Sequence, residues 1–414
     1  MTASPLYPRF AEPRLSEALA DTPVVLVHGP RQCGKTTLAR IVGEPRGYAY
    51  FSFDDPVVLA SATADPVGFV AELPGRAILD EVQRAPGIFV ALKTAVDRRR
   101  VPGRFILTGS TSVLFVPRLS DSLAGRMEIL RLYPLAQCEI ERTPPRFLDA
   151  LFSGSFRTRA YERLGKLLAE RIAKGGYPAA LARATPRRRM AWYRDYVETI
   201  VKRDVRDLAR IRALDALPRL LALAAGQTAR LLNISDLAGP FHLSRPTIAE
   251  YVGLLEQLFL LERLPPWHSN RMSRLVKTPK LHLGDTGIAC ALLRLDAVAL
   301  DADRATLGRL LETFVFQEIR RQASWHDEPV EFLHFRDKDG VEVDIVAERG
   351  TQVVGVEVKA SSTATNGDFA GLRKLKQATG KRFAAGVVLY DGESSASFGD
   401  GLYAVPIRAL WEMK

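Results

Sequence analysis

The sequence predicts an α/β protein whose first third is built on a parallel sheet. Short apolar runs, typical of buried parallel strands, lie at 22–28, 77–79 and 104–107. A segment with mostly helical apolar spacing, 86–100, separates the last two runs. Because strands that alternate with helices favour parallel pairing, we expect one α/β domain over about 20–135.

A glycine-rich loop follows the first apolar run. Residues 29–36 read G-x-x-x-x-G-K-[ST] and lie between a predicted strand and a helix that opens at Thr37. In such a loop, backbone N–H groups and the helix dipole bind phosphates, Lys35 spans the β and γ phosphates, and the Thr36 hydroxyl is a ligand of Mg²⁺. The alternative is a glycine turn that binds nothing. The motif predicts a site for ATP and Mg²⁺ formed by Gly29, Pro30, Arg31, Gln32, Cys33, Gly34, Lys35, Thr36 and Thr37.

Two adjacent carboxylates end the apolar run at 77–79. Asp80 and Glu81 are expected at the carboxyl edge of a parallel sheet, where ligands bind in such folds. We expect Asp80 to hold Mg²⁺ through water and Glu81 to orient or deprotonate the attacking water. An acidic turn without a catalytic role is the alternative.

Further candidates are two hydroxyls, an arginine and a cysteine. Thr108 and Ser110 follow the third run, where they either contact the γ-phosphate or cap the strand end. Arg126 is the candidate cation for neutralising transition-state charge, in the same chain or across a subunit boundary, unless it is simply solvated. Cys33 stands beside Lys35 at a helix amino terminus, which would lower its pKa, or it is a small residue that the loop tolerates.

Together these segments resemble a family of prokaryotic AAA-type ATPases whose C-terminal half is usually described as a domain of unknown function. The resemblance covers most of the chain and is carried by HGPRQCGKTTLAR, FSFDDP, AILDEVQRAPGIF, FILTGSTS and LAGRMEILRLYPL. It implies a P-loop ATPase core with its second strand at about Ala49–Phe53. Asp54 and Asp55, which follow that strand, are then expected to be structural.

The middle of the chain changes to charged, helix-forming sequence at 161–174 and 192–208, which predicts a helical lid or connector. Two short helices joined by a turn within 231–258 then resemble a winged helix-turn-helix, with Phe259–Leu264 as the wing strand. Its second helix carries Arg245, Thr247 and Tyr251, and serves either DNA contact or packing and regulation. A basic run between His268 and Lys280 is either a phosphate-binding surface or a solvated face; it contains Arg271, Arg274, Lys277 and Lys280.

Near the C-terminus, alternating residues at 341–346 and 352–359 flank a turn that contains Gly350, which predicts a β-hairpin. Glu357 and Lys359 share a face of one strand, and Asp344 lies on the other strand. This trio resembles the PD-(D/E)XK nuclease family, which has a restriction-endonuclease-like α/β fold. The resemblance implies Mg²⁺ or Mn²⁺ bound by Asp344 and Glu357, with Lys359 positioning or helping to deprotonate water. The alternative is an exposed hairpin with ordinary alternating charges.

The nuclease resemblance also implies a helix before the hairpin that adds another acid to the metal site. Leu307, Leu311, Phe314, Val315 and Ile319 define its apolar stripe. Family likeness points to Glu312, whereas Glu318 lies on the stripe and needs a buried partner. The choice between the two stays open on sequence alone.

The composition of the chain indicates its cellular compartment and the kind of partner it binds. Three widely spaced cysteines cannot build a disulfide framework, so we expect a reducing compartment and a cytoplasmic location. No apolar run approaches the roughly 20 residues that span a bilayer, and the first residues lack a signal-peptide pattern, so no membrane partner is expected. A formal net charge of +11 favours polyanionic partners such as DNA or RNA.

These features predict an Mg²⁺-dependent ATPase coupled to nucleic-acid binding or processing. A homo-oligomer is a further candidate assembly, and the sequence leaves the oligomeric state open. The alternative function is a nucleotide-dependent switch that binds protein partners and retains an inactive nuclease-like scaffold. The expected segments are an N-terminal segment (1–20), an AAA-type ATPase domain (21–140), a helical lid or connector (141–225), a winged-helix-like domain (226–300) and a nuclease-like domain (301–414).

Overall fold

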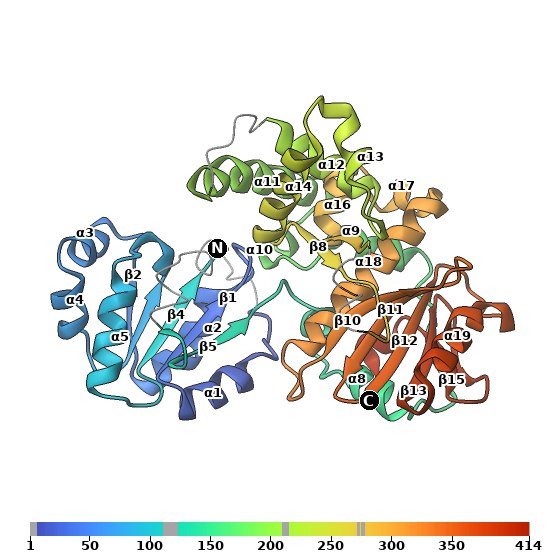
Figure 1. Cartoon of the computed structure of the whole chain (residues 1–414), viewed down its shortest axis with the longest axis horizontal. Coiled ribbons are helices and arrows are strands. Elements are labelled where there is room, and N and C mark those ends of the chain that lie inside the picture. Colours follow the sequence, from blue (N-terminus) through green and yellow to red (C-terminus); the bar gives the residue numbers. More distant parts are fainter. Residues whose placement is uncertain (1–5, 111–122, 209–214, 271–273, 275–277, 414) are drawn as a thin grey trace. The chain divides into compact units, whose positions relative to one another are not determined.

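The computed structural model of the chain describes residues 6–110, 123–208, 215–270, 274 and 278–413, without the side chains of 203–208. These residues form two compact units. The N-terminal unit comprises Arg9–Leu135 with Gln257–Phe259, and the C-terminal unit comprises Met1–Pro8, Ala136–Glu256 and Leu260–Lys414. Figure 1 labels many of their helices and strands.

The described part of the N-terminal unit contains a five-stranded sheet in the order β2-β3-β4-β1-β5. Its strands are β1 (Val24–His28), β2 (Ala49–Ser52), β3 (Ala77–Asp80), β4 (Phe105–Gly109) and β5 (Met127–Arg131). All of its strand pairs are parallel. The expected α/β class and parallel sheet are confirmed, whereas β5 is a strand that the apolar runs do not predict.

Helices cover this parallel sheet on both faces. On one face, Gly43 lets its helix approach closely, because a Cβ there would lie 2.8 Å from Ile78 Cδ1. On the other face a core joins Leu26, Leu79 and Leu107 of the strands to Phe89 and Leu92 of a helix. The helices of this unit are α1 (Glu12–Asp21), α2 (Lys35–Gly43), η1 (Glu44–Arg46), α3 (Pro56–Ala64), α4 (Pro66–Glu72), η2 (Val82–Arg84) and α5 (Ile88–Arg98).

The two aspartates after β2 have structural partners, as the family resemblance implies. Asp55 caps α3 by accepting hydrogen bonds from the backbone N–H groups of Val57 and Val58, at 2.8 and 3.3 Å. Asp54 pairs with Arg84.

The C-terminal unit begins with helices and a small sheet. Its first helices are α7 (Gln137–Glu141), α8 (Phe147–Ser153), α9 (Lys166–Lys174), α10 (Pro178–Leu181), α11 (Pro186–Leu208) and α12 (Ala216–Gly226). There follow β7 (Arg230–Leu231), α13 (Ile234–Ala238), η4 (Gly239–Phe241), α14 (Arg245–Gln257), β8 (Leu261–Leu264) and β9 (Lys280–Leu283). The three strands form an antiparallel sheet with β9 in the middle. Of the expected wing segment, only Leu261–Leu264 is a strand.

A larger mixed sheet completes the C-terminal unit, in the order β10-β11-β12-β13-β15-β14-β6 among the described residues. Its strands are β6 (Arg159–Ala160), β10 (Glu331–Arg336), β11 (Glu342–Arg349), β12 (Gln352–Lys359), β13 (Phe383–Tyr390), β14 (Ser394–Ser397) and β15 (Leu402–Pro406). The β11–β12 hairpin is the expected one, although β11 extends to Arg349 and shortens the expected turn. The remaining helices are α16 (Thr286–Leu293), α17 (Ala297–Ala302), α18 (Arg304–Ala323), η5 (Asn366–Phe369), α19 (Ala370–Thr379), η6 (Gly380–Arg382) and α20 (Ala409–Glu412).

A buried ionic network ties the helices of the C-terminal unit together. Asp285, which is fully buried, accepts hydrogen bonds from the N–H groups of Gly176 and Gly287 at 2.8 and 2.9 Å. The guanidinium of Arg321 on α18 bonds both Asp285, at 2.9 Å, and Glu318, at 3.0 Å. Removing one member would leave a buried charge without its counter-charge, so the network fixes α16 against α18.

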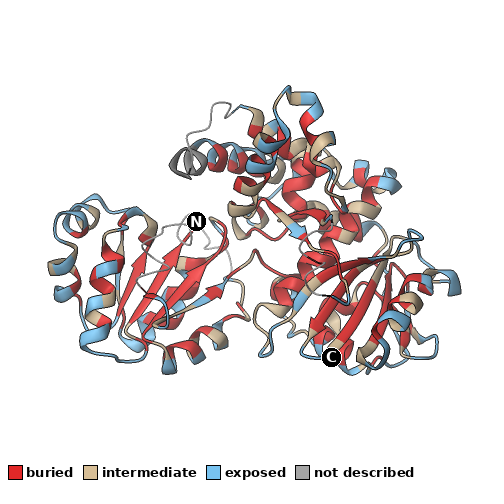
Figure 2. Ribbon diagram, in the orientation of Figure 1, coloured by how far each residue is buried: buried red, intermediate tan, exposed pale blue. Residues whose placement is uncertain are grey.

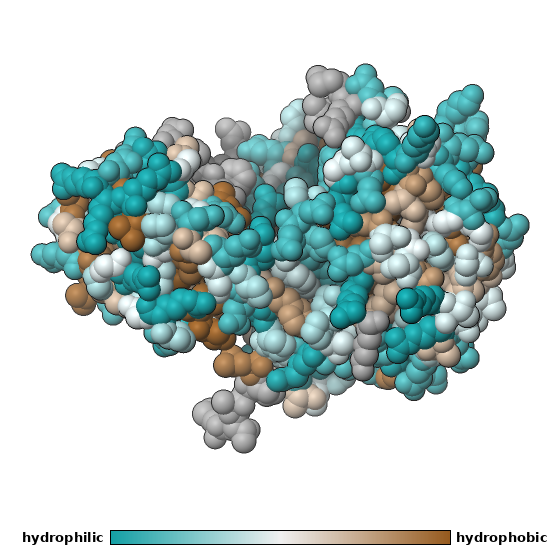
Figure 3. All heavy atoms as spheres, turned by 90° about the horizontal axis from the view of Figure 1, so that it is seen from below, coloured by the Kyte–Doolittle hydropathy of each residue, from teal (hydrophilic) through white to brown (hydrophobic). Residues whose placement is uncertain are grey.

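Burial follows the two large sheets, whose central strands are largely red in Figure 2. The face drawn in Figure 3 is mostly hydrophilic, with smaller patches of apolar side chains. Among the described helices, none combines the length and the apolar character needed to cross a bilayer.

Candidate functional site

The phosphate loop connects β1 to α2 at the carboxyl edge of the parallel sheet. Its chain curls because Gln32 and Gly34 adopt left-handed conformations, with φ of 59° and 101°. Helix α2 begins at Lys35, directly after Gly34, so its amino terminus faces the loop. Left-handed turns at a helix amino terminus orient backbone N–H groups toward an anion. The nine expected residues, Gly29 to Thr37, therefore form one continuous loop and helix start.

The side chains of Lys35 and Arg9 both donate hydrogen bonds to backbone carbonyls of this loop. The side chain of Lys35 is buried, and its Nζ donates to the carbonyl of Pro30 at 2.8 Å. Arg9 donates from Nη1 to the carbonyl of Cys33 at 2.6 Å and from Nη2 to that of Tyr133 at 2.7 Å. Arg9 thus fastens the loop to the segment after β5. No motif in the sequence identifies Arg9, because its partners are backbone atoms far along the chain.

Gly29 allows the phosphate loop to pack closely against the backbone of Leu132. A Cβ at this position would lie 2.0 Å from the carbonyl oxygen of Leu132, a backbone atom that cannot rotate away. We expect Gly29→Ala to lower the free energy of unfolding of the N-terminal unit by about 1–3 kcal/mol. Chemical denaturation followed by circular dichroism would measure the change.

Gly75→Ala is the matched control for this substitution, because no atom lies within 4 Å of its Cβ position. Its denaturation midpoint should stay close to that of the wild type. Equal midpoints for Gly29→Ala and Gly75→Ala would contradict the close-contact role of Gly29.

Asp80 is the centre of a hydrogen-bond junction beside the loop. Its carboxylate accepts from Thr36 Oγ1 at 2.8 Å, from Thr108 Oγ1, and from the hydroxyl of Tyr50 at 2.9 Å. Sheet order explains the meeting, since β4 lies between β3 and β1 and all three end at this edge. Burial, followed by the charge of Asp80, raises the pKa of Tyr50 to about 12. Three of the expected residues, Thr36, Asp80 and Thr108, are therefore brought together.

This junction fits a Mg²⁺ ion bound with a nucleotide. Mg²⁺ prefers oxygen ligands and usually keeps several waters. The hydroxyl of Thr36 can be a direct ligand, and Asp80 lies one hydrogen bond away from it, where it can hold a coordinated water.

Glu81 follows Asp80 in a strained backbone conformation, with φ of 57°. Its N–H donates to Thr108 Oγ1 at 3.2 Å. Gln83 Nε2 donates both to the Glu81 carboxylate and to Ser110 Oγ, the latter at 2.9 Å. The expected residues Glu81 and Ser110 are thus linked by Gln83, which sequence reasoning missed although it stands two positions after Glu81.

Of the two interpretations of Cys33, the structure supports the small residue that the loop tolerates. The residue is fully buried, and its Sγ lies 3.4 Å from the carbonyl of Leu132. Burial raises the pKa of this thiol, and the nearby Lys35 only partly opposes the rise. Cys33 is therefore a packing residue of the loop.

The structure also corrects a role for Arg126 in its own chain. Arg126 immediately precedes β5, which runs parallel to β1. It therefore lies at the amino edge of the sheet, whereas the phosphate loop lies at the carboxyl edge. Its guanidinium pairs with Asp97, with Nε 2.5 Å from Oδ1. A role across a subunit boundary stays a prediction.

Several residues that were candidates for contact with nucleic acid are buried. Tyr251 of α14 is only 4% exposed, and Arg274 forms a two-point ion pair with Glu348 at 2.9 and 3.0 Å. Lys280 is also buried. Two other members of the basic run, Arg271 and Lys277, lie outside the described residues.

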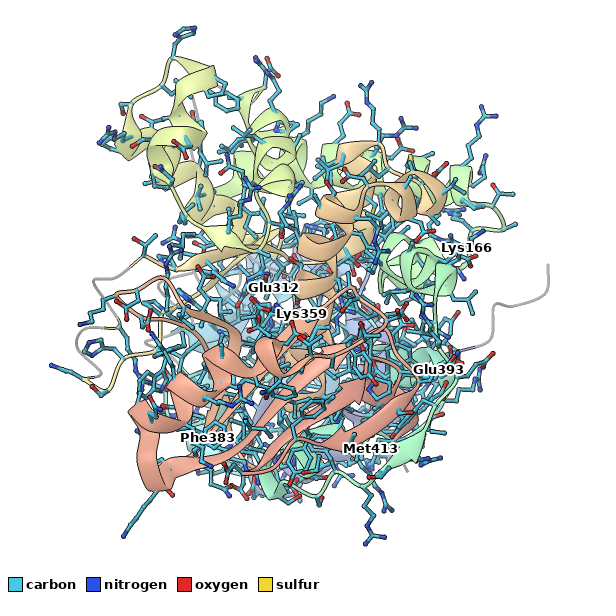
Figure 4. All side chains as sticks on the ribbon, turned by 90° about the vertical axis from the view of Figure 1, so that its right-hand side faces the viewer. Lys166, Glu312, Lys359, Phe383, Glu393 and Met413 are labelled. Atoms are coloured by element: carbon cyan, nitrogen blue, oxygen red, sulfur yellow. The ribbon has the colours of Figure 1, made fainter. Side chains whose placement is uncertain are left out.

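In the C-terminal unit, the expected acidic trio lies on the β11–β12 hairpin. Lys359 Nζ donates to Glu357 Oε1 at 2.8 Å, and the N–H of Val358 donates to Asp344 Oδ2 at 3.0 Å. Burial, followed by the charge of Asp344, raises the pKa of Glu357 to about 7. Asp344, Glu357 and Lys359 do converge, and Glu312 of α18 joins them; Figure 4 labels Glu312 and Lys359.

A buried lysine sits among these acids. Lys280 Nζ lies 2.8 Å from Glu312 Oε1 and 3.1 Å from Asp344 Oδ1. Burial acts to lower the pKa of Lys280, but Asp344 and Glu312 outweigh it and hold the pKa above its ordinary value. Burial and the charge of Asp344 raise the pKa of Glu312.

The described residues do not support the expected second metal site. Within the described ranges, no group of three or more His, Cys, Asp or Glu side chains is arranged to hold a metal ion. The ammonium of Lys280 lies between the carboxylates of Glu312 and Asp344, two of the three residues expected to bind the metal.

The open choice between Glu312 and Glu318 is resolved by their partners. Glu318 is fully buried and accepts from the N–H of Gln137 at 2.8 Å and from Arg321 at 3.0 Å. Glu318 therefore belongs to the structural network around Asp285. Glu312 is the helix acid that reaches the hairpin cluster.

Comparison with known proteins divides the chain into three segments, each of which matches a different family model. Family models match it over 21–141 (AAA domain), 165–299 (domain of unknown function, DUF8612) and 307–410 (domain of unknown function, DUF4143). An uncharacterized protein of Mycobacterium tuberculosis is 29% identical over 401 residues, covering 96% of this chain and 83% of that protein. An uncharacterized protein of Methanocaldococcus jannaschii is 26% identical over 323 residues, covering 70% of this chain and 66% of that protein.

Solved structures are more distant. The Walker-type ATPase PABY2304 of Pyrococcus abyssi is 16% identical, with a TM-score of 0.42 over 69% of this chain and 96% of that chain. The RuvB Holliday junction branch migration motor of Thermotoga maritima is 19% identical, with a TM-score of 0.28 over 62% of this chain and 89% of that chain. TM-scores of this size do not establish a common fold.

Proposed function

We propose that this chain, which carries an AAA-type ATPase domain at residues 21–141, hydrolyses ATP with Mg²⁺ and couples hydrolysis to the handling of nucleic acid. The observation that carries the ATPase proposal is the meeting of Thr36, Asp80 and Thr108 beside the phosphate loop. An acidic strand end at hydrogen-bond distance from the loop threonine suits the Mg²⁺ that accompanies a bound nucleoside triphosphate.

Each residue of this site has a separate task in hydrolysis. Lys35 binds the β and γ phosphates, and the amino terminus of α2 adds backbone N–H donors. Thr36 and Asp80 hold Mg²⁺, which supplies neutralisation of the phosphate charge. Glu81 orients the attacking water and accepts its proton, and Gln83 fixes the Glu81 carboxylate.

Coupling to nucleic acid rests on charge and on the order of elements between α12 and β9. The order α12–β7–α13–α14–β8–β9 with β9 central supports a winged-helix-like element. Arg245 stands exposed at the start of α14. The net charge of +11 favours a polyanionic partner, either DNA or RNA. A cytoplasmic location and homo-oligomer formation remain predictions of the sequence.

ATP hydrolysis should change when single-stranded or duplex nucleic acid is added. Phosphate release would be measured for the full chain at several salt concentrations, because phosphate contacts weaken as salt rises. Arg245→Glu should weaken the apparent affinity for nucleic acid while basal hydrolysis stays unchanged. Arg187→Glu, an exposed arginine on α11, is the control.

The outcomes separate the two parts of the proposal. Hydrolysis that is unaffected by every DNA and RNA tested, together with no binding, would remove the coupling and leave the ATPase. An absence of hydrolysis under all conditions would remove the ATPase itself.

A further inference from the structure

Lys280 occupies a fixed and buried position in the C-terminal unit. It belongs to β9, the middle strand of its sheet, and its backbone pairs with Leu264 of β8 and Leu231 of β7. Its side chain is only 3% exposed. A buried ammonium needs counter-charges at hydrogen-bond distance, because its desolvation is otherwise too unfavourable.

Those counter-charges come from α18 and β11. Lys280 Nζ lies 2.8 Å from Glu312 Oε1, 3.1 Å from Asp344 Oδ1 and 3.8 Å from Glu342 Oε2. Glu312 and Asp344 are two of the carboxylates that the nuclease resemblance assigns to a divalent metal. The same oxygens therefore surround an amine of the chain itself.

A divalent ion and this ammonium cannot share the position. Magnesium coordinates oxygen at roughly 2.0–2.1 Å, so an ion bound to both Glu312 and Asp344 would lie close to Lys280 Nζ. Two positive charges in one small buried space repel strongly, since the interior screens them far less than water does. The carboxylates of Glu312 and Asp344 can therefore pair with only one cation between them, and that position is taken by the ammonium of Lys280.

We propose that Lys280 is a built-in cation that replaces the divalent metal of the nuclease-like domain. The ammonium joins β9 to α18 and β11 without any metal, and the domain has no metal-assisted phosphodiester hydrolysis at this cluster. This inference goes beyond the ATPase proposal and does not depend on it.

Lys359 provides a matched comparison within the same cluster. Its side chain is 34% exposed, and its Nζ bonds Glu357 at 2.8 Å. Removing the Lys359 amine leaves Lys280 between Glu312 and Asp344. Removing the Lys280 amine instead vacates the space between those carboxylates.

The test is a titration of the full chain with Mn²⁺ in the absence of nucleotide. The electron paramagnetic resonance signal of free Mn²⁺ measures how much Mn²⁺ is bound. The wild type and Asp344→Asn should give the same isotherm. Lys280→Met should gain one Mn²⁺ site that is lost again when Asp344→Asn is added. Lys359→Met and Lys280→Arg should gain none. Lys280→Gln replaces Lys280→Met if circular dichroism shows that the latter is unfolded.

Two results would overturn the proposal. One is a wild-type chain that binds Mn²⁺ at a site lost in Asp344→Asn, since the metal would then coexist with Lys280. The other is a folded Lys280→Met or Lys280→Gln chain that gains no Mn²⁺ site. If both Lys280 variants are unfolded, the comparison of the wild type with Asp344→Asn decides alone.

Discussion

Replacing Lys35 with alanine should abolish tight ATP binding and lower kcat for ATP hydrolysis by about 100-fold or more, as the loss of a preorganised donor does. Lys35 is buried at the first position of α2, and its ammonium lies over the phosphate loop, 2.8 Å from the Pro30 carbonyl. No neighbouring ammonium can replace it, because the other lysine of the N-terminal unit, Lys93, lies on α5. Nucleotide binding by fluorescence titration and phosphate release would measure the two effects.

Lys93→Ala is the matched control for this substitution, being the same change in the same unit. It should bind and hydrolyse ATP like the wild type. A Lys35→Ala chain with wild-type affinity and turnover would show that the loop does not bind the triphosphate.

Glu81→Gln should separate binding from turnover. The change keeps the size of the side chain but removes its charge and its ability to accept a proton. We expect ATP affinity to stay close to that of the wild type while kcat falls by roughly 10²–10⁴-fold, the usual contribution of a positioned general base. Single-turnover ADP formation would measure the chemical step without product release.

Glu72→Gln at the exposed end of α4 is the control for Glu81→Gln. It should leave both binding and kcat unchanged. Normal turnover by Glu81→Gln would mean that another group activates the water, and the role of Gln83 as its positioning partner would fall with it.

The nucleotide site was predictable because its signals are local. The spacing of Gly29, Gly34 and Lys35 defines the loop without any tertiary information. The parallel strands then imply that residues after β3 and β4 lie beside it, which brings Asp80 and Thr108 to the junction. Tyr50 and Arg9 were beyond reach, because their contacts depend on side-chain direction and on distant backbone carbonyls.

Arg126 is a residue of the same domain whose position the sequence leaves open. Whether Arg126 can reach the nucleotide depends on which end of a strand it lies at. The apolar runs of the sequence do not predict β5, the strand that follows it. Met127–Arg131 mixes three apolar residues with Glu128 and Arg131 and does not alternate strictly, so its signal for a strand is weak. Assigning this strand parallel to β1 would have placed Arg126 at the edge away from the loop.

Lys280 is a clearer example of a residue whose role local sequence patterns do not predict. In the sequence it ends a basic run that reads as a solvated or phosphate-binding face. Its burial follows from β9 becoming the middle strand of a sheet, and its partners Glu312 and Asp344 lie 32 and 64 positions away. A local pattern carries no information about such pairings, so a cluster that reads as a metal site contains an amine instead.

Equilibrium binding of a fluorescent ATP analogue to the wild-type chain, with Mg²⁺ and with EDTA, tests the nucleotide site most directly. The geometry of the phosphate loop and of the Thr36–Asp80 pair predicts saturable binding of one nucleotide per chain, tighter when Mg²⁺ is present. No saturable binding in either condition, by a chain shown to be folded, would contradict the site.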